Sequence, residues 1–498
     1  MSIFQNYRED EKNTSKPVEA PSVANTSTPK QSNQENEKNA PSALELLLNG
    51  LNEQYHFISF ERHLYVYDER YGYWRLIPAS NSNYELRTLI PKDLKRIALK
   101  VNFSALYDWL LVDAERVDST FFEEKWHWIN FKNYAYNWEK HKVEKDRKRF
   151  NFRYVLNINC PSKNDQPTGA FHKFVEHLFD DNDTRNEFCK FLALCFGNVR
   201  TLKYCFFLHG ASNTGKSTML NVIKYILGEE NCSSLSFSQF SNEFALTQLL
   251  GKRANLSGEV SGATNKKMDI LKSASGNDTI AMSYKGKDHF TYQNLCMLIF
   301  ACNTLPCIPD FLEVSSFLSR MIIFPFSKPV AREDWDKDLL QKLTADVAGI
   351  FQCIVSGFRL LEKDGYKIKE SEAMRIPKTS YAGTWESFSL FCDKYIVPDP
   401  KGKLTSAEIQ NAYRVFCNQH DYVELASNQW SQVLRRNIPC KPSTAVKHVE
   451  GEKKTRGRAY KGITFSKSIS DLLEKEPVVH NDSHGSNSNS FLPSNYNL

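Results

Sequence analysis

The chain has 498 residues, of which 24% are charged and 41% hydrophobic, and its formal net charge is +6. This length exceeds one ordinary domain and suffices for several hydrophobic cores, and no apolar run reaches the ~18 residues of a membrane span. The twelve cysteines contain no CxxC pair, which predicts neither zinc nor disulfides, and the first residues lack a signal-peptide pattern, so we expect a cytoplasmic protein without membrane contact.

Composition sets off both ends of the chain and a long aromatic region. Residues 1–40 and 469–498 are rich in Ser, Asn and Pro, which predicts disordered tails. Residues 41–195 contain strand-like stretches with many aromatic residues and then a helical run, which predicts an α+β domain. Aromatic side chains between Lys and Arg could stack on bases, but packing in a core is the simpler interpretation.

Two short motifs have simpler explanations than a catalytic site. DDND at 180–183 could supply the paired carboxylates of a nucleotidyl-transfer site, but the following residues predict a helix for which these residues serve as cap and first turn. NKKMD at 265–269 has one residue more than the guanine-binding NKxD pattern and lies in a predicted helix. We therefore expect no GTP site.

A strand, a polar loop and a helix follow one another from residue 203. KYCFFLH predicts a buried strand, GASNTGKS a loop, and TMLNVIKYIL a helix that ends at Gly228 in a left-handed C-cap. Gly210, Gly215, Lys216 and Ser217 fit the pattern GxxxxGK[ST]. This order is the one that a phosphate-binding loop requires.

The loop predicts binding of ATP. Its glycines let backbone N–H groups turn towards the phosphates, Lys216 would reach the β and γ phosphates, and the Ser217 hydroxyl would bind Mg²⁺. The predicted nucleotide-binding residues are Gly210, Ala211, Ser212, Asn213, Thr214, Gly215, Lys216, Ser217 and Thr218.

Hydrolysis needs further polar groups near the phosphates, and three candidates lie at strand ends. Glu259 ends the predicted strand KRANLSGEV, Asn303 follows the apolar run LCMLIFAC, and Arg320 precedes the strand MIIFPF. Each residue type is common at such positions. Their joint occurrence downstream of one phosphate loop favours a single site.

Five motifs occur in a fixed order between Leu202 and Phe326: GASNTGKST, GKRANLSGEV, KSASGNDTIAMSYKGKDHF, LIFACNTLP and SRMIIFPF. This order resembles the superfamily 3 helicase core of the AAA+ type, specifically the phage, plasmid and poxvirus primase-helicase group. The resemblance implies an α/β fold with a P-loop AAA+ ATPase core at 196–380. It also implies a helicase-associated α+β domain at 41–195 and a winged-helix-like DNA-binding domain at 381–468.

The resemblance also implies residue roles. Glu259 would activate water and share the metal with Ser217, Asn303 would position that water, and Arg320 would act on the nucleotide of a neighbouring subunit. Gly258 departs from the pattern, because many relatives carry a second acid there. Mg²⁺ keeps several waters, so Ser217 with phosphate oxygens could suffice.

Two basic stretches are candidates for DNA contact. The SYKGKDHF turn matches the DNA-contacting hairpin of the group, and its lysines Lys285 and Lys287 flank Gly286. From 435 to 461 there are nine Lys or Arg against two Glu, and the end of this stretch predicts a basic wing. A solvated loop would explain either stretch as well. The predicted wing contacts are Lys453, Lys454, Arg456 and Arg458.

The resemblance implies an ATP-driven DNA helicase for the replication of a virus, phage or plasmid in a host cell. An arginine donated by a neighbour implies a homo-hexameric ring that moves on single-stranded DNA and also meets duplex DNA. No carboxylate cluster indicates a primase, so a separate primase or polymerase would serve as partner. Two alternatives stay open: another P-loop DNA motor, and a DNA-binding replication initiator with little or no unwinding.

Overall fold

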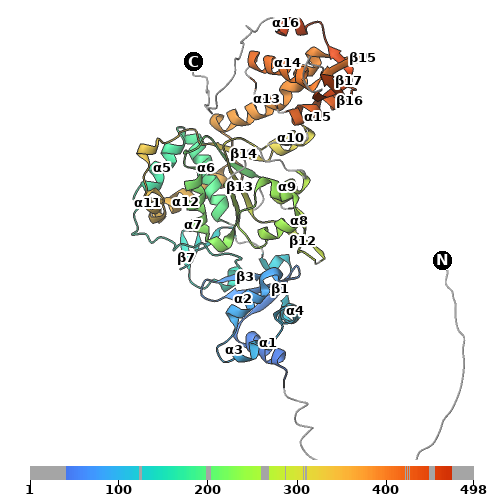
Figure 1. The fold of residues 1–498 in the computed structure, drawn as a ribbon. Coiled ribbons are helices and arrows are strands. Elements are labelled where there is room, and N and C mark those ends of the chain that lie inside the picture. Colours follow the sequence, from blue (N-terminus) through green and yellow to red (C-terminus); the bar gives the residue numbers. More distant parts are fainter. Residues whose placement is uncertain are drawn as a thin grey trace, which may run out of the picture.

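The computed structural model describes residues 41–122, 126–197, 203–258, 268–276, 278–286, 288–306, 308, 311–420, 422, 424–425, 427–447 and 455–473. The predicted tail 1–40 lies outside this range, as does 474–498. Residues 469–473 form a short helix, so ordered structure continues past the predicted start of the C-terminal tail. The N-terminal, central and C-terminal parts of the chain follow one another along the molecule (Figure 1).

The N-terminal part consists of two small sheets with helices. A mixed sheet has the order β3-β2-β1-β4, and an antiparallel sheet has the order β5-β6-β7. The elements are α1 (Ala43–Gln54), β1 (Phe57–Phe60), β2 (His63–Asp68), β3 (Tyr73–Ile77), α2 (Ser82–Leu89), α3 (Lys95–Ala98), α4 (Phe103–Asp113), β4 (Glu115–Arg116), β5 (Trp128–Asn130), β6 (Ala135–Asn137) and β7 (Lys142–Glu144). Trp74, Trp138 and Tyr154 are at most 2% exposed, which confirms the core interpretation for these aromatic residues.

A parallel sheet forms the central part, with the order β14-β8-β13-β10-β9. Its strands are β8 (Cys205–His209), β9 (Cys232–Ser233), β10 (Ala254–Ser257), β13 (Met297–Cys302) and β14 (Met321–Pro325). The helices around it are α5 (Ala170–Leu178), α6 (Asn182–Phe196), α7 (Lys216–Leu227), α8 (Glu243–Leu246), α9 (Met268–Ser275), α10 (Phe311–Leu318), α11 (Leu339–Ala345) and α12 (Val347–Lys363). A hairpin of β11 (Thr279–Ser283) and β12 (His289–Gln293) precedes β13.

Both faces of this sheet are buried, because successive side chains of a strand point to opposite faces. Phe206 of β8 belongs to one hydrophobic core with Phe191 of α6, while its neighbour Phe207 belongs to a second core with Phe300 of β13. The strands are therefore apolar along their whole length, as the sequence indicated. The observed fold is α/β with a parallel sheet.

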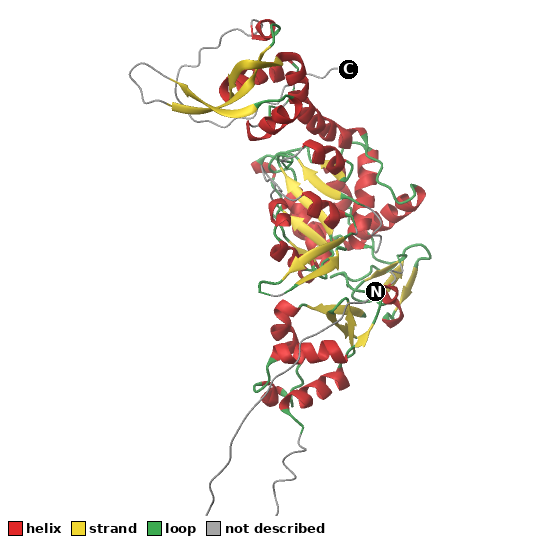
Figure 2. Cartoon of the chain, turned by 90° about the vertical axis from the view of Figure 1, so that its right-hand side faces the viewer, coloured by secondary structure: helices red, strands yellow, loops and turns green. Residues whose placement is uncertain are grey.

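The C-terminal part begins within the long helix α13 (Glu372–Tyr395). A three-stranded antiparallel sheet follows in the order β15-β17-β16, with helices packed against it. The elements are β15 (Ile396–Thr405), α14 (Ser406–Gln419), α15 (Ser427–Asn437), β16 (Lys441–Lys447), β17 (Thr455–Phe465) and α16 (Ile469–Leu473). Figure 2 shows β16 and β17 extending beyond the helices as a long hairpin.

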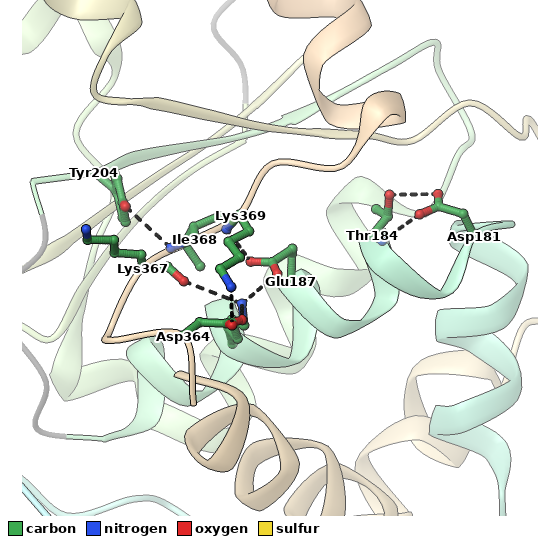
Figure 3. A network of polar contacts seen from close by, with 9 residues as sticks. Asp181, Thr184, Glu187, Tyr204, Asp364, Lys367, Ile368 and Lys369 are labelled. Carbon is green, nitrogen blue, oxygen red and sulfur yellow. Dashed lines mark hydrogen bonds and ion pairs between the residues drawn. The ribbon is translucent and has the colours of Figure 1, made fainter. Parts of the chain in front are cut away.

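Helices α6 and α12 are joined by a buried charge network and a disulfide. The Lys190 ammonium is 1% exposed and contacts Glu187 Oε1 at 2.6 Å and Asp364 Oδ2 at 2.5 Å. Lys369 contacts the other Asp364 oxygen at 2.5 Å from the surface (Figure 3). Burial raises the pKa of Glu187, whereas hydrogen bonds from Lys190 and Lys369 lower the pKa of Asp364 to about 2.

Three expectations need correction or confirmation here. Cys189 and Cys353 form a disulfide with a Cα–Cα distance of 5.3 Å, so the prediction of no disulfide was wrong. The two positions are 164 residues apart, a proximity that spacing in the sequence cannot reveal. Gly228 caps α7 with φ +87° but ψ 148°, so the cap is not left-handed helical as predicted. Asp181 caps α6 by accepting from Thr184 N–H, which confirms the interpretation of DDND.

No single helix among the described residues is long and apolar enough to cross a membrane. Helices α11 and α12 reach such a length only as a pair, and they are bent by 65° at the break between them.

Candidate nucleotide-binding site

The loop between β8 and α7 is held tightly against the rest of the sheet. A Cβ atom on Gly210 would collide with the Phe326 carbonyl oxygen, so only glycine allows this approach. Gly215 has φ +89° and forms the N-cap of α7 without a side-chain hydrogen bond. The first N–H groups of α7 thus have no side-chain cap, and a helix N-terminus of this kind is suited to an anion.

Lys216 is the central cation of the loop. Its ammonium donates to the carbonyl oxygens of Gly210 at 2.7 Å and Ala211 at 2.5 Å, and to Thr214 Oγ1 at 3.3 Å. The residue is 8% exposed, and burial lowers its pKa. Among the described residues it forms no ion pair, so its charge is compensated only by loop dipoles. A phosphate oxygen could replace those carbonyls and would supply the missing negative charge.

Asn303 lies beside this loop. It follows β13, which pairs with β8 so that Cys302 stands opposite His209. The Asn303 Nδ2 donates to Ser212 Oγ at 3.3 Å, and its side chain is exposed. An amide group thus reaches the loop from the neighbouring strand, as expected when the carboxyl ends of parallel strands share one edge.

His209 was not among the predicted site residues. Burial and the adjacent Lys216 charge lower its pKa, and it forms a hydrogen bond with the Asn303 backbone. It therefore links the end of β8 to the end of β13 directly behind the loop. The signal in the sequence was a single polar residue at the end of an apolar strand.

Arg320 lies at the opposite edge of the sheet. It precedes β14, whose first residue Met321 pairs with Cys205 at the start of β8. The guanidinium donates to Lys272 O at 2.9 Å and to Ser275 Oγ at 3.3 Å, at the end of α9. The structure thus does not bring Arg320 together with Lys216 of the same chain.

A cavity of about 520 Å³ lies beside α7 and extends the loop region. Ser217 is on one wall and Gly258, directly after β10, is on another. The cavity also contains Lys224, Lys252 and polar side chains of the β9 region. Glu259 lies outside the described residues, but its neighbour Gly258 places the chain at the same cavity as the Ser217 hydroxyl. A hydroxyl and a carboxylate are ligands that suit Mg²⁺.

The β11–β12 hairpin carries Lys285 in its turn. Lys285 is exposed and Gly286 has φ +76°, as the tight turn requires, while Lys287 lies outside the described residues. The base of the hairpin contacts the N-terminal part: the His63 ring lies 5.2 Å from Phe290 and 6.1 Å from Tyr292.

The predicted wing residues lie partly beyond the described chain. Lys453 and Lys454 are outside it, and for Arg456 only the backbone in β17 is described. Arg458 is exposed on β17, opposite Thr444 of β16. Figure 1 shows this hairpin at the far end of the molecule from β12, so Lys285 and the wing are separate surfaces.

Comparisons with known proteins give limited similarity. Residues 208–316 match a family described as of unknown function, DUF5906. Over 220 residues, or 41% of this chain, the sequence is 26% identical to "Putative helicase 121R" of Invertebrate iridescent virus 3. The match covers 23% of that viral protein, so the chain spans about a quarter of its length.

Two solved structures of the NrS-1 C-terminal region are also similar to this chain. The A form of the apo structure covers 85% of this chain and 100% of that chain, with 15% identity and a TM-score of 0.41. Another apo structure covers 84% and 99%, with 16% identity and a TM-score of 0.42.

Proposed function

We propose that this chain is an ATP-dependent DNA helicase that serves the replication of a virus, phage or plasmid. One observation carries the proposal: Lys216 has no anionic partner among the described residues, and Asn303 reaches the same loop from the adjacent strand. The similarity to a viral protein named as a helicase supports the choice of DNA unwinding over other ATP-driven processes.

Each residue would have a distinct part in ATP hydrolysis. Lys216 would leave the loop carbonyls and bind the β and γ phosphates, and the N–H groups at the start of α7 would hold the remaining oxygens. Glu259 would orient water for attack, with Asn303 holding that water in line. The bound Mg²⁺ would neutralise phosphate charge, and Ser217 and Glu259 fit it because both adjoin one cavity.

The remaining calls concern assembly and DNA. Arg320 cannot serve its own loop from the opposite edge of the sheet, so we propose that it serves the loop of a second copy in a homo-hexameric ring. Lys285 would contact single-stranded DNA, and the basic C-terminal hairpin would contact duplex DNA. The 41–195, 196–380 and 381–468 boundaries are kept as the proposed helicase-associated, P-loop AAA+ and winged-helix domains, with a separate primase or polymerase as partner.

One observation favours the alternative of a replication initiator with a weak ATPase. Gly258 supplies no second acid next to Glu259, although a Cβ atom there would meet nothing within 4 Å. Packing therefore does not require glycine at this position. An enzyme with a single acid would hold its metal less firmly, which suits slow turnover.

ATP turnover measured with and without single-stranded DNA tests the proposal. Lys216→Ala should abolish turnover, Glu259→Gln should stop turnover while retaining ATP binding, and exposed Lys145→Ala should change neither. Strand displacement by the wild-type protein separates a helicase from the alternatives. Wild-type turnover by Glu259→Gln would reject the assigned catalytic base, and DNA-stimulated turnover without strand displacement would favour another DNA motor.

A further inference from the structure

Three exposed lysines form one row across the C-terminal sheet. Lys461 of β17 pairs in register with Lys403 of β15 on one side and with Lys441 of β16 on the other. We call Lys403, Lys461 and Lys441 the lysine row. None of the three is among the wing residues considered above.

The lysine row lies on the open face of the sheet. Leu404 and Tyr460, the neighbours of Lys403 and Lys461 along their strands, also pair in register and are both 6% exposed. Tyr460 contacts Trp430 of α15 at 6.0 Å, so the helices cover that face. Because side chains alternate along a strand, the lysines point away from the helices.

The lysine row has no negative charge to balance it. Among the described residues, none of the three forms an ion pair, and Lys403 Nζ donates instead to the Thr444 carbonyl at 2.9 Å. The nearby acids have other partners: Asp399 accepts from the Lys401 N–H at 2.9 Å, and Glu408 accepts from the Thr405 N–H at 2.7 Å. Like charges directly opposite each other destabilise a sheet. The free protein therefore gains nothing from this arrangement.

Glycines next to the lysines hold the strands in this register. β15 is irregular between Pro398 and Lys403, and a Cβ atom on Gly402 would collide with the Ile463 carbonyl. Gly462, which follows Lys461, has φ +93°. Close approach at one glycine and a left-handed conformation at the other bring Lys403 and Lys461 side by side.

We propose that the lysine row binds successive phosphates along one nucleic acid strand. Strands in a sheet are about 4.8 Å apart, so the outer two lysines are about 10 Å apart at the backbone. A duplex rises about 3.4 Å per phosphate of one strand, so ~10 Å of its axis matches about three phosphates. The inference rests on the proposed function, because it requires a DNA-binding protein, and it adds a contact surface separate from the hairpin tip.

Salt-dependent binding of the full chain tests the lysine row. The probes are a fluorescent 20-base-pair duplex and a single strand of the same length, titrated by anisotropy between 50 and 200 mM salt. The variant combines Lys403→Gln, Lys441→Gln and Lys461→Gln. A matched control changes the exposed Lys140, Lys142 and Lys163 to Gln, which removes the same charge elsewhere. A third variant replaces the row by Arg.

Loss of each phosphate contact should reduce the slope of log affinity against log salt by about 0.9 for duplex or about 0.7 for single strands. The larger decrease identifies which nucleic acid the row binds. The row variant should lose slope, the Arg variant should keep it, and the row variant should be at least as heat-stable as the wild type. A row variant with the slope of the control overturns the inference alone, whereas a wild-type protein without DNA affinity overturns the proposed function as well. Lys461→Gln alone, which removes the central charge, gives the same test with the smallest change.

Discussion

Replacement of Arg320 by alanine separates action between subunits from a structural role. The strand β14 begins next to Arg320 and ends at Pro325, beside the loop. At about 3.3 Å per residue this distance is roughly 13 Å, and the loop lies farther still. Because the guanidinium is already bound at the end of α9, Arg320 cannot reach phosphates held by its own Lys216.

The expected effect is large if Arg320 serves a second copy. An arginine donated to a departing phosphoryl group contributes ~10³-fold or more to turnover, so Arg320→Ala should be nearly inactive alone. Lys216→Ala should be inactive for a different reason. When the two are mixed in equal amounts, about a quarter of head-to-tail interfaces pair an intact loop with an intact arginine. ATP turnover should therefore return to a sizeable fraction of the wild-type rate.

The measurement is steady-state ATP turnover of the mixture, with subunit exchange verified by native mass spectrometry. A structural role predicts another pattern: Arg320→Ala would lose the two hydrogen bonds to α9, worth about 1.5–3 kcal/mol each for a charged donor, and would melt at a lower temperature. No recovery of turnover despite proven exchange would refute action between subunits and remove the main support for a ring.

Two further predictions concern stability. Lys190→Ala should lower the free energy of unfolding by about 3–5 kcal/mol, because it leaves two carboxylates without their buried partner, whereas Lys369→Ala, whose side chain is 64% exposed, should cost less than ~1 kcal/mol. Urea unfolding of both variants checks this, and equal losses would contradict it. Burial lowers the pKa of His63 to about 4. Since the unfolded chain binds a proton below pH ~6.5 and the folded chain does not, stability should fall by up to about 1.4 kcal/mol per unit from pH 6.5 towards 4. His63→Phe should remove this part of the acid sensitivity in thermal unfolding, and an unchanged pH profile would reject the assignment.

The sequence predicted those parts of the fold that depend on neighbouring residues. The apolar strand before Gly210 and the helix after Ser217 are local patterns, and both were found where expected. The position of Asn303 followed from one rule: parallel strands end at a common edge. Its contact with Ser212 is the geometric consequence.

Other features depend on residues far apart in the chain, which no local pattern encodes. Lys190 reads as an exposed helix residue until Asp364, 174 residues later, is placed beside it. Cys189 and Cys353 likewise meet only because α6 packs against α12. Arg320 was correctly placed before a strand, but the edge on which it lies became clear only with the register of β14 against β8.

One strand connects the loop with the hairpin that carries Lys285. β13 ends next to Asn303, which contacts the loop, and begins next to Cys296, whose N–H donates to Asn294 Oδ1 at 3.2 Å. Asn294 Nδ2 in turn donates to the Ala274 carbonyl of α9 at 2.6 Å, and α9 and β12 both adjoin this end of the sheet. A buried parallel strand is stiff, so a displacement at Asn303 on loss of the γ phosphate would reach the hairpin base without unfolding any element between them. Under the proposed function, this strand is the shortest physical connection between ATP turnover and movement of DNA.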